Sequence, residues 1–474
     1  MDYITNFLFM RSEVSLLIVI VFLLLFDLIA GKKGMKYFQP VAIVVFALHT
    51  IITFMPQLAG SSFGGMYEYL PMHSVIKSIL NLATLVIFLQ AKDVFDGKLQ
   101  SNKRGEYYFL TLITLLGMYF MISSGHFLMF FLGLEMASIP LAILAAFEKH
   151  SKKSAESGAK YILLAAFSSG IMLFGISYLY GAVGTLYFAD MPELITANAM
   201  QILAFVFFIS GLFFKVSLVP FHLWAADVYE GAPTNVTAYM SVVSKGSAVF
   251  VLMTLLFKVF GNLIVEWQGI LYGITIVTIT LANLFAIRQN NIKRFFAFSS
   301  ISQAGYLVLA IIAGTAFGMT TLVYYIFVYV FSNLAAFGVI SAIENRSGKV
   351  NISDYKGLYS TNPKLSFVMM LALFSLGGIP PFAGFFSKFF IFAAALEQGF
   401  YVLVLIAVVN TIISLYYYLL VVKAMFLDSS DNPIPTLRTD FFNRTSLVLT
   451  TAGILLAGIL SFFMEKIELF SFGM

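Results

Sequence analysis

Long apolar runs recur along the whole sequence and constrain its fold more than any other feature. A helix that crosses a bilayer needs about 20 mainly apolar residues, and runs of this length occur about fourteen times. Hydrophobic residues make up 60% of the 474 positions and charged residues 11%, whereas a typical soluble domain has about 25% charged residues. The sequence therefore predicts an integral membrane protein.

The type of span follows from the length of these runs. Only helices and closed barrels satisfy their backbone polar groups inside a bilayer, and the runs are too long and too uniformly apolar for barrel strands. We therefore expect an all-α membrane protein of about 14 transmembrane helices. The expected spans cover residues 12–30, 38–58, 72–91, 107–123, 126–147, 159–181, 200–225, 236–260, 268–287, 296–314, 319–343, 365–396, 400–425 and 445–464.

Basic residues concentrate in every second connection between these spans. The positive-inside rule places those connections in the cytoplasm and both termini on the opposite side. The apolar run from Val14 to Ala30 has no small-residue cleavage site after it, so it is interpreted as the first span rather than as a signal peptide. The loop after the seventh span is an exception, because it carries Asp227 and Glu230 and no base. We expect that loop to be packed into the protein.

Several classes of chemistry are absent from the sequence. The chain has no cysteine, which excludes iron–sulfur clusters held by its own thiolates and Cys-zinc sites. Its five histidines show no metal-binding spacing, and no GxGxxG or Walker motif is present. The net charge of +5 lies in short loops and does not indicate nucleic-acid binding.

Residues 211–246 hold Lys215 and Lys245 in two apolar runs on either side of a polar segment. Pro220 lacks a backbone donor and clashes with the preceding turn, so it is expected to break the helix. A charge near the bilayer centre costs roughly 2.5–3.5 kcal/mol on insertion scales. Two such lysines beside a helix breaker therefore need a functional explanation.

A second broken span is expected at residues 375–390, SLGGIPPFAGFFSKFF, which contain Lys388. Broken helices at corresponding positions indicate two inverted five-helix repeats, with discontinuous helices 7 and 12. The sequences of the two broken spans match only weakly, because Lys215 precedes the break in its span whereas Lys388 follows the break in its span. The expected divisions are residues 1–95 (peripheral helices 1–3), 105–262 (first repeat), 263–426 (second repeat) and 427–474 (helix 14).

Asp27 and Glu135 are the acidic residues expected within spans. Glu135 lies about nine residues into its span, which at 1.5 Å per residue is about 14 Å deep and near the midplane. We expect it in one row with Lys215, Lys245 and Lys388. Asp27 lies near the cytoplasmic end of its span, beside Lys32 and Lys33, and is expected to have a local structural partner. Lys77 lies near the end of its span and is expected to extend its amine to the interface.

Such a row is suited to proton transfer. Desolvation disfavours the charged form of a lysine, and a nearby carboxylate favours it, so a change at Glu135 would alter the proton affinity of Lys215. His222, just past the first break, could join the relay or cap a helix. The structural alternatives are that the lysines are hydrogen-bond donors between helices and that the glycines and prolines serve close helix packing. His49 is interpreted as a packing residue.

Two stretches carry a family resemblance. Residues 220–245 read PFHLWAADVYEGAPTNVTAYMSVVSK, and residues 131–140 read FLGLEMASIP. They resemble the signature of the antiporter-like membrane subunits of respiratory complex I and of Mrp-type cation/proton antiporters, and the resemblance covers essentially the whole chain. The chain ends soon after its last span, whereas L-type subunits have a long lateral helix, and M-type subunits carry Glu at the position of Lys388. The resemblance is therefore closest to the N-type subunits of bacterial NADH-quinone oxidoreductases.

The resemblance implies that Glu135, Lys215, Lys245 and Lys388 are pumping residues, coupled to quinone reduction elsewhere in a complex. It implies no redox cofactor on this chain, with NADH, quinone, FMN and iron–sulfur clusters in other subunits. The implied partners are other membrane subunits of the complex, and the implied location is the bacterial inner membrane, with both termini in the periplasm.

The second half departs from the family pattern, because related subunits often place a His or Lys between the central lysine and the exit. A relay here would depend on hydroxyls, amides and water. The candidates are Ser299, Ser300, Ser302, Gln303, Tyr306, Tyr324, Tyr325 and Asn333. Two other functions stay open: a subunit of an Mrp-type antiporter, which would be expected to need more buried acids, and an inert scaffold.

Overall fold

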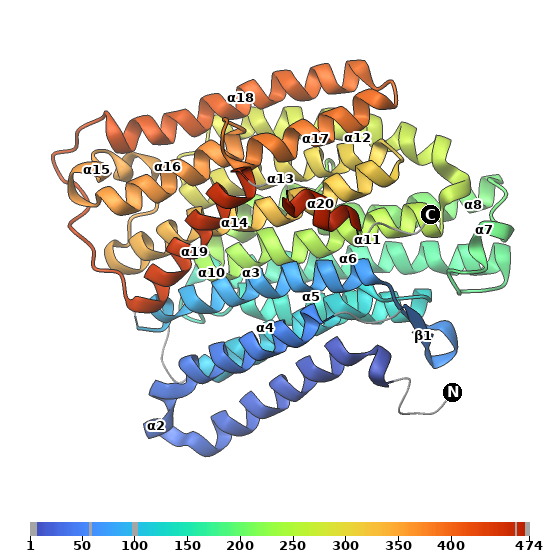
Figure 1. Cartoon of the computed structure of the whole chain (residues 1–474), viewed down its shortest axis with the longest axis horizontal. Coiled ribbons are helices and arrows are strands. Elements are labelled where there is room, and N and C mark those ends of the chain that lie inside the picture. Colours follow the sequence, from blue (N-terminus) through green and yellow to red (C-terminus); the bar gives the residue numbers. More distant parts are fainter. Residues whose placement is uncertain (1–6, 56–58, 97–102, 460–461, 470–474) are drawn as a thin grey trace.

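The structure is a computed structural model that describes residues 7–55, 59–96, 103–459 and 462–469. Long helices lie side by side in one bundle (Figure 1). The helices are α2 (Arg11–Phe54), α3 (Pro71–Asp96), α4 (Arg104–Ile122), α5 (Phe127–Ala145), α6 (Lys152–Val183), α7 (Met191–Leu194), α8 (Ala199–Val216), α9 (Leu223–Gly231), α10 (Thr234–Tyr239), α11 (Lys245–Lys258), α12 (Ile264–Ile287), α13 (Ile292–Ile312), α14 (Ala316–Ser347), α15 (Leu358–Thr361), α16 (Pro363–Gly377), α17 (Ala383–Glu397), α18 (Tyr401–Phe426), α19 (Phe441–Ile459) and α20 (Phe462–Leu469). Short 3-10 turns cover Phe63–Gly65 (η1), Gly261–Leu263 (η4) and Ile352–Tyr355 (η5), and a π-helical turn (η3) covers Met240–Ser244.

The expected all-α membrane architecture is confirmed. Within the described residues, 13 helical segments are long and apolar enough to cross a membrane, and two of them lie in α2 on either side of a kink at Gly31. Gly31 has φ 53°, a conformation that glycine adopts without steric cost. The remaining expected span, residues 365–396, is the broken pair α16 and α17, each too short to span alone.

A small hairpin that was not predicted lies at one end of the bundle. Strands β1 (Gly60–Ser62) and β2 (Tyr67–Tyr69) pair antiparallel, with Ser61 opposite Glu68. The hairpin lies near the end of the bundle where α7 and the beginning of α2 are also found (Figure 1).

The two expected breaks have the same local geometry. In the first, α8 ends at Ser217 in the left-handed region (φ 66°), and the Leu218 N–H donates to the carbonyl oxygen of Phe213 over 2.9 Å. In the second, α16 ends at Gly378 (φ 83°), and the Ile379 N–H donates to the carbonyl oxygen of Phe374 over 3.0 Å. A cis peptide bond precedes Pro220 and another precedes Pro381.

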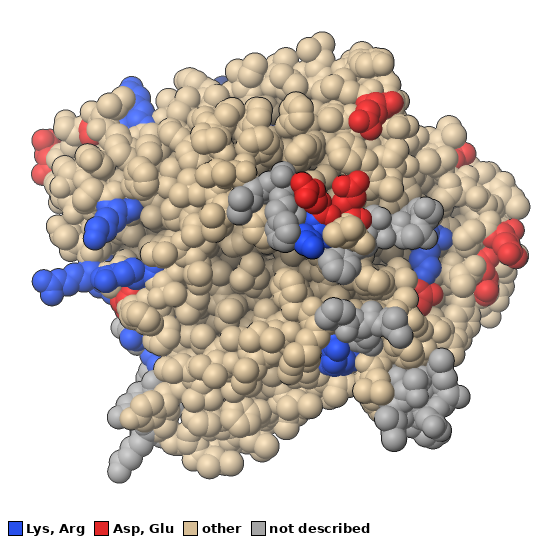
Figure 2. All heavy atoms as spheres, viewed as in Figure 1, with Lys and Arg blue, Asp and Glu red and all other residues tan. Residues whose placement is uncertain are grey.

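Charged side chains are unevenly distributed along the bundle. Lys and Arg gather at the end where α15 and α16 lie, and most of the visible Asp and Glu lie toward the other end (Figure 2). At the basic end, Asp227 accepts from Lys160 and Arg294, each over 2.6 Å, and Glu230 accepts from Lys153 over 2.8 Å and from Arg294 over 3.0 Å. These five residues, the acid–base cluster, hold α9 against α6 and α13, so the loop after the seventh span is packed into the protein as expected.

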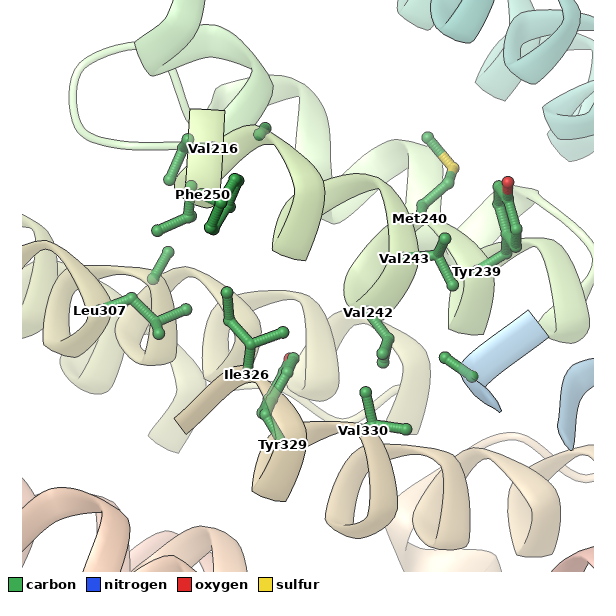
Figure 3. Packing of buried hydrophobic residues seen from close by; sticks show 14 of the residues in the cluster. Val216, Tyr239, Met240, Val242, Val243, Phe250, Leu307, Ile326, Tyr329 and Val330 are labelled. Atoms are coloured by element: carbon green, nitrogen blue, oxygen red, sulfur yellow. The ribbon is translucent and has the colours of Figure 1, made fainter. Parts of the chain in front are cut away.

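The centre of the bundle contains α13 and α14. In the apolar 18-residue stretch of each helix, 100% and 94% of the residues are buried. By contrast, 22% of the residues are buried in the corresponding stretch of the first helical segment, Arg11–Gly31, which presents apolar side chains outward. Val242 and Phe250 point toward Leu307, Ile326 and Val330 of these central helices (Figure 3). Buried side chains on all sides explain why these spans are apolar around their whole circumference.

Gly384 lets α17 pack against the break before it. A Cβ atom added at Gly384 would lie 1.7 Å from the carbonyl oxygen of Ser375. The Gly384 N–H also donates to the Ser375 hydroxyl over 3.1 Å, and that hydroxyl lies 2.7 Å from the Ser332 hydroxyl of α14. Close packing is therefore a real role for this glycine.

We expect Gly384→Ala to destabilise the protein by about 1–3 kcal/mol, because the added methyl group meets backbone that cannot move without separating α16 from α17. Gly170→Ala is the matched control, since nothing lies within 4 Å of a Cβ atom there. Thermal unfolding in detergent measures both. Equal stability of the two variants would contradict the packing role.

The acid–base cluster predicts a dependence of stability on pH. Partial burial raises a carboxyl pKa, but the hydrogen bonds from Lys160 and Arg294 outweigh it and hold the pKa of Asp227 below its usual value. The pKa of Glu230 is lowered in the same way by Lys153 and Arg294. A carboxyl group with a lowered pKa stabilises the fold above its unfolded pKa, and the contribution is lost as pH falls through the folded value.

Arg294→Gln should therefore cost roughly 1 kcal/mol at neutral pH, a modest amount because the pairs are partly exposed. The loss should shrink as the pH falls below about 4 and then through the lowered pKa values of the two carboxyl groups, because they become protonated there. Thermal unfolding of both proteins across this range is the measurement. A difference that stays constant with pH would show that the ion pairs do not contribute to stability.

Candidate functional site

Lys215 lies at the end of α8, directly before the first break. Its Nζ donates to the Ser138 hydroxyl of α5 and, over 3.2 Å, to the Tyr161 hydroxyl of α6. The amine also lies 5.4 Å from the centre of the Tyr161 ring. Helices α5, α6 and α8 thus surround a partly buried ammonium group with neutral hydroxyl oxygens.

Glu135 does not bond to Lys215, contrary to our expectation of a direct pair. Ser138, which does, lies one turn further along α5, so the carboxylate is close enough for an electrostatic interaction with Lys215. Glu135 Oε1 is buried and has no hydrogen-bond partner among the described residues. Its side chain lines a groove of about 670 Å³ on the outer face of α4 and α5, together with Phe120, Leu132 and other apolar residues.

Lys245 lies in the centre of the bundle, where the π-helical turn η3 meets α11. It is 2% exposed, and its Nζ donates to the Ser300 hydroxyl of α13 over 2.6 Å and to the Ser300 carbonyl oxygen over 3.1 Å. Within the part of the chain that the structure describes, no carboxylate is paired with it. Its ammonium group therefore depends on neutral partners, which makes its charged form costly in this interior.

Aromatic side chains fill the space between Lys215 and Lys245. The rings of Tyr161 and Trp224 lie 5.2 Å apart, and those of Trp224 and Tyr229 lie 6.2 Å apart. The Tyr229 hydroxyl lies near Ser300 but forms no well-aligned hydrogen bond with a described group. A buried hydroxyl without a partner is a place where an ordered water is expected.

Beyond Lys245, hydroxyl and amide groups continue across α13 and α18. Ser299 lies 2.5 Å from the Tyr418 hydroxyl, which in turn accepts from Gln303 Nε2 over 3.2 Å. Gln303 also accepts from the Tyr325 hydroxyl. These contacts place three of the expected polar candidates, Ser299, Ser300 and Gln303, on one side of α13.

Lys388 completes the row at the second break. Its Nζ donates to the carbonyl oxygen of Leu376 over 2.8 Å, and Gln303 Nε2 donates to the same oxygen over 3.2 Å. The end of α16 leaves this carbonyl without an intrahelical partner, so the break itself supplies the acceptor. The amine also lies 4.9 Å from the centre of the Tyr306 ring.

The other expected polar candidates lie beside the row. Asn333 donates to Ser241 and to Tyr329, each over 2.9 Å. Tyr324 donates to the carbonyl oxygen of Ala457, away from the row, and the Ser302 hydroxyl is buried without a partner among the described residues.

His222 is buried just past the first break. Neither ring nitrogen has a hydrogen-bond partner among the described residues, and its side chain does not cap α9. The structure thus gives no support to the capping role. Asp27 lies against Gly105 of α4; its expected neighbours Lys32 and Lys33 fall outside the described side chains.

The expectation for Lys77 was wrong. Lys77 is 0% exposed and forms an ion pair with Glu13 over 2.6 Å, so its amine does not reach the interface. His49 is buried as expected, but it lies in a hydrogen-bonded cluster with Ser15 and Tyr119 rather than among apolar groups alone. The prediction for Lys77 used only its position near a helix end, because nothing in the local sequence indicates its distant partner Glu13.

Sequence reasoning also missed Ser138, Tyr161 and Tyr418. A lone hydroxyl in an apolar span has no pattern that separates it from a packing residue, so these groups are recognised only once the helices are in place.

As a whole, the site joins buried amines to hydroxyls, amides and one freed carbonyl across two broken helices. Such an arrangement can pass protons and offers no ligand set for a metal within the described residues.

Comparison with known proteins gives a consistent family. A family model described as NADH:quinone oxidoreductase/Mrp antiporter, TM matches residues 124–414. A relative from Phocaeicola vulgatus, named NADH-quinone oxidoreductase subunit N, is 57% identical over 97% of this chain and 97% of its own length. A relative of the same name from Moorella thermoacetica is 38% identical over 85% of each chain.

Solved structures support the same family. A chain of respiratory complex I from Thermus thermophilus is 29% identical, covers 95% of this chain and 97% of its own length, and superposes with a TM-score of 0.80. A chain of the Mrp complex from a Dietzia species is 20% identical over 98% of this chain and 96% of its own, with a TM-score of 0.84, and shares the fold. The chain therefore belongs to the NADH:quinone oxidoreductase/Mrp antiporter family of membrane subunits and groups with its N-type members.

Proposed function

We propose that this chain is a proton-translocating membrane subunit of a complex I-type NADH-quinone oxidoreductase. Protons move through a relay of Glu135, Lys215, Lys245 and Lys388. The observation that carries the proposal is that each of the three lysines donates to a neutral buried acceptor beside or between the two breaks: Lys215 to Tyr161, Lys245 to Ser300 and Lys388 to the carbonyl of Leu376. The family and its N-type relatives support the same function.

The relay works by changing the balance between charged and neutral lysine. The Glu135 carboxylate favours the ammonium form of Lys215, and its neutralisation or displacement releases a proton toward the aromatic segment at Tyr229. Lys245 and Lys388 have no carboxylate partner among the described residues, so no fixed negative charge retains the proton on either amine, and each passes it on. Buried waters complete the transfers where side chains are not in direct contact. His222 is a further proton carrier next to the first break.

The open position of Glu135 suits exchange with a neighbouring subunit. Its carboxylate lines an outward groove with exposed apolar residues such as Leu132 and Ile139. Exposed apolar surface beside a buried charge is typical of a site covered by another protein in the membrane. The partners are the other membrane subunits of the complex.

Redox chemistry belongs elsewhere in this proposal. This chain carries no redox centre, and NADH, quinone, FMN and iron–sulfur clusters reside in other subunits, whose quinone reduction drives the pump. The basic end of the bundle in Figure 2 faces the cytoplasm of a bacterial cell. Both termini then lie on the periplasmic side of the inner membrane.

Two inverted five-helix repeats, residues 105–262 and 263–426, build the relay. The similar backbone geometry of the two breaks, each ending in a left-handed residue with a matching hydrogen bond, supports this division. An odd number of spans per repeat inverts the second copy. Helices 1–3 (residues 1–95) and helix 14 (427–474) lie outside the repeats.

A subunit of an Mrp-type cation/proton antiporter is the alternative function. The Mrp chain from Dietzia shares the fold, but its identity of 20% is far below the 57% of the relative named NADH-quinone oxidoreductase subunit N. Sodium-dependent proton movement in membranes without a quinone oxidoreductase would favour the antiporter.

Lys215→Ala tests the proposal directly. Proton transfer through a positioned group typically contributes 10²–10⁴-fold, so we expect coupled proton export and quinone reduction to fall at least about tenfold in membranes that retain an assembled complex. Lys349→Ala is the control, because this lysine bonds to a loop carbonyl at Asn432 away from the row. Full pumping in assembled Lys215→Ala would reject the relay role of this lysine and favour a scaffold.

The hydroxyl route in the second half predicts an effect of Tyr418→Phe. This change removes the oxygen between Ser299 and Gln303, so we expect proton export to slow severalfold with normal assembly. Tyr417→Phe is a matched control in the same helix, because its hydroxyl donates to Asn283 instead. Equal rates in the two variants would exclude Tyr418 from the relay.

A further inference from the structure

A second cluster of buried titratable groups lies outside the row, in α2, α3, α4 and the hairpin. Lys77 Nζ contacts Glu13 Oε1 over 2.6 Å and the Ser123 hydroxyl over 2.7 Å, and the Tyr67 hydroxyl donates to Glu13 Oε2 over 2.9 Å. All four of these residues are at most 2% exposed. We call the following residues the α2–α4 network: Glu13, His49, Tyr67, His73, Lys77, Asn81, Tyr119 and Ser123.

The inner part of the network surrounds His49. The Ser15 hydroxyl donates to the Ser12 carbonyl, so it accepts from His49 Nδ1 at 2.9 Å. His49 Nε2 faces the Asn81 amide at 3.3 Å and the Tyr119 oxygen at 3.2 Å. The neutral ring can accept from Asn81, and the protonated ring can donate to Tyr119. The site therefore has hydrogen-bond partners for both charge states of this imidazole.

The outer part of the network leads to the surface beneath the hairpin. His73, Lys77 and Asn81 recur at intervals of four on α3, so they lie on one face of the helix. His73 Nδ1 lies 3.2 Å from the carbonyl oxygen of Glu68. The side chain of Glu68 pairs with Lys258, and these two side chains are 20% and 30% exposed. Titratable groups thus extend from a partly exposed ion pair to the interior along one helix face.

The network also reaches the helix that carries the central lysine. A Cβ atom added at Gly246, next to Lys245, would lie 3.6 Å from the side chain of Leu80, next to Asn81. The inner end of the network and the middle of the row are therefore on helices in direct contact, although no hydrogen bond between them is seen among the described residues.

From this geometry we infer that the α2–α4 network is a second proton-exchange site of this subunit, which opens toward the hairpin end of the bundle. A proton moves from Lys77 Nζ to Glu13 Oε1: an N–H bond breaks, an O–H bond forms, and a neutral amine and carboxylic acid remain. Lys258 Nζ of the surface pair gives up a proton, which reaches the neutral Lys77 amine by way of the His73 imidazole and buried water, so one N–H bond breaks at Lys258 and one forms at Lys77. The Glu13 acid then gives its proton through buried water to His49 Nε2, so an O–H bond breaks at Glu13, an N–H bond forms at His49, and His49 carries the charge on the inner side. The inference rests on the proposed function, which places this end in the periplasm.

The double variant Glu13→Gln with Lys77→Met separates this role from a structural one. Removing one partner leaves an unpaired buried charge, whereas replacing both leaves neutral groups of similar size. We expect the variant complex to assemble, and its coupled proton export to fall at least about tenfold. Lys92→Met with Asp440→Asn is the matched control, because it removes an ion pair at the opposite end of α3.

A second measurement is independent of turnover. Infrared difference spectra of the assembled complex, recorded between neutral and acid pH, should show a protonated carboxyl band that disappears in Glu13→Gln. If the double variant does not assemble, His49→Gln takes its place, since it keeps a neutral hydrogen-bonding group beside Tyr119 but cannot hold the charge. Its proton export should then be reduced in an assembled complex.

The inference is overturned if the assembled double variant pumps protons normally, or if His49→Gln does so where it replaces the double variant. It is also overturned if the infrared spectra show no Glu13 carboxyl band. The row of lysines is judged separately. Normal pumping in Lys215→Ala as well would reject the proposed function, whereas loss in Lys215→Ala alone would reject only the second site.

Discussion

The structure depends on how a buried ammonium group finds hydrogen-bond acceptors in an apolar bundle. In a continuous helix each carbonyl oxygen already accepts from the helix's own N–H groups, so few are open to a side chain. The break after α16 frees the carbonyl of Leu376 for Lys388, and the break after α8 places Lys215 beside Ser138 and Tyr161. The discontinuous helices and the lysines are therefore one feature, since each makes the other tolerable in the membrane.

Neutral acceptors have a consequence for function. A lysine whose carboxylate partner is partly exposed to water stays charged, whereas a lysine held in the interior by hydroxyls and carbonyls can lose its proton at lower cost. Lys245 and Lys388 are of the second kind, and Glu135 stands near Lys215 without bonding to it. The ion pairs that Arg294 makes with Asp227 and Glu230 at the basic end of the bundle are partly exposed and hold their charges.

Much of this could be predicted from the sequence. The spans and both breaks follow from hydropathy and from proline, which act over a few neighbouring residues. Partners from distant helices could not be predicted. Glu13 and Lys77 are 64 residues apart, and nothing local distinguishes a lysine that pairs from one that reaches the interface. The same limit applies to Tyr161 and Tyr418, whose roles depend on which face of each helix meets the next.

The central claim is that a continuous proton path joins Lys215 to Lys245. The most direct measurement is an experimental map of the assembled complex at a resolution that shows ordered water around Tyr161, Tyr229 and Ser300. The account predicts at least one water bound to the Tyr229 hydroxyl that connects it to Ser300 or Tyr161, because that hydroxyl is buried without a partner among the described residues. A dry, closely packed apolar gap between the two lysines would contradict the account.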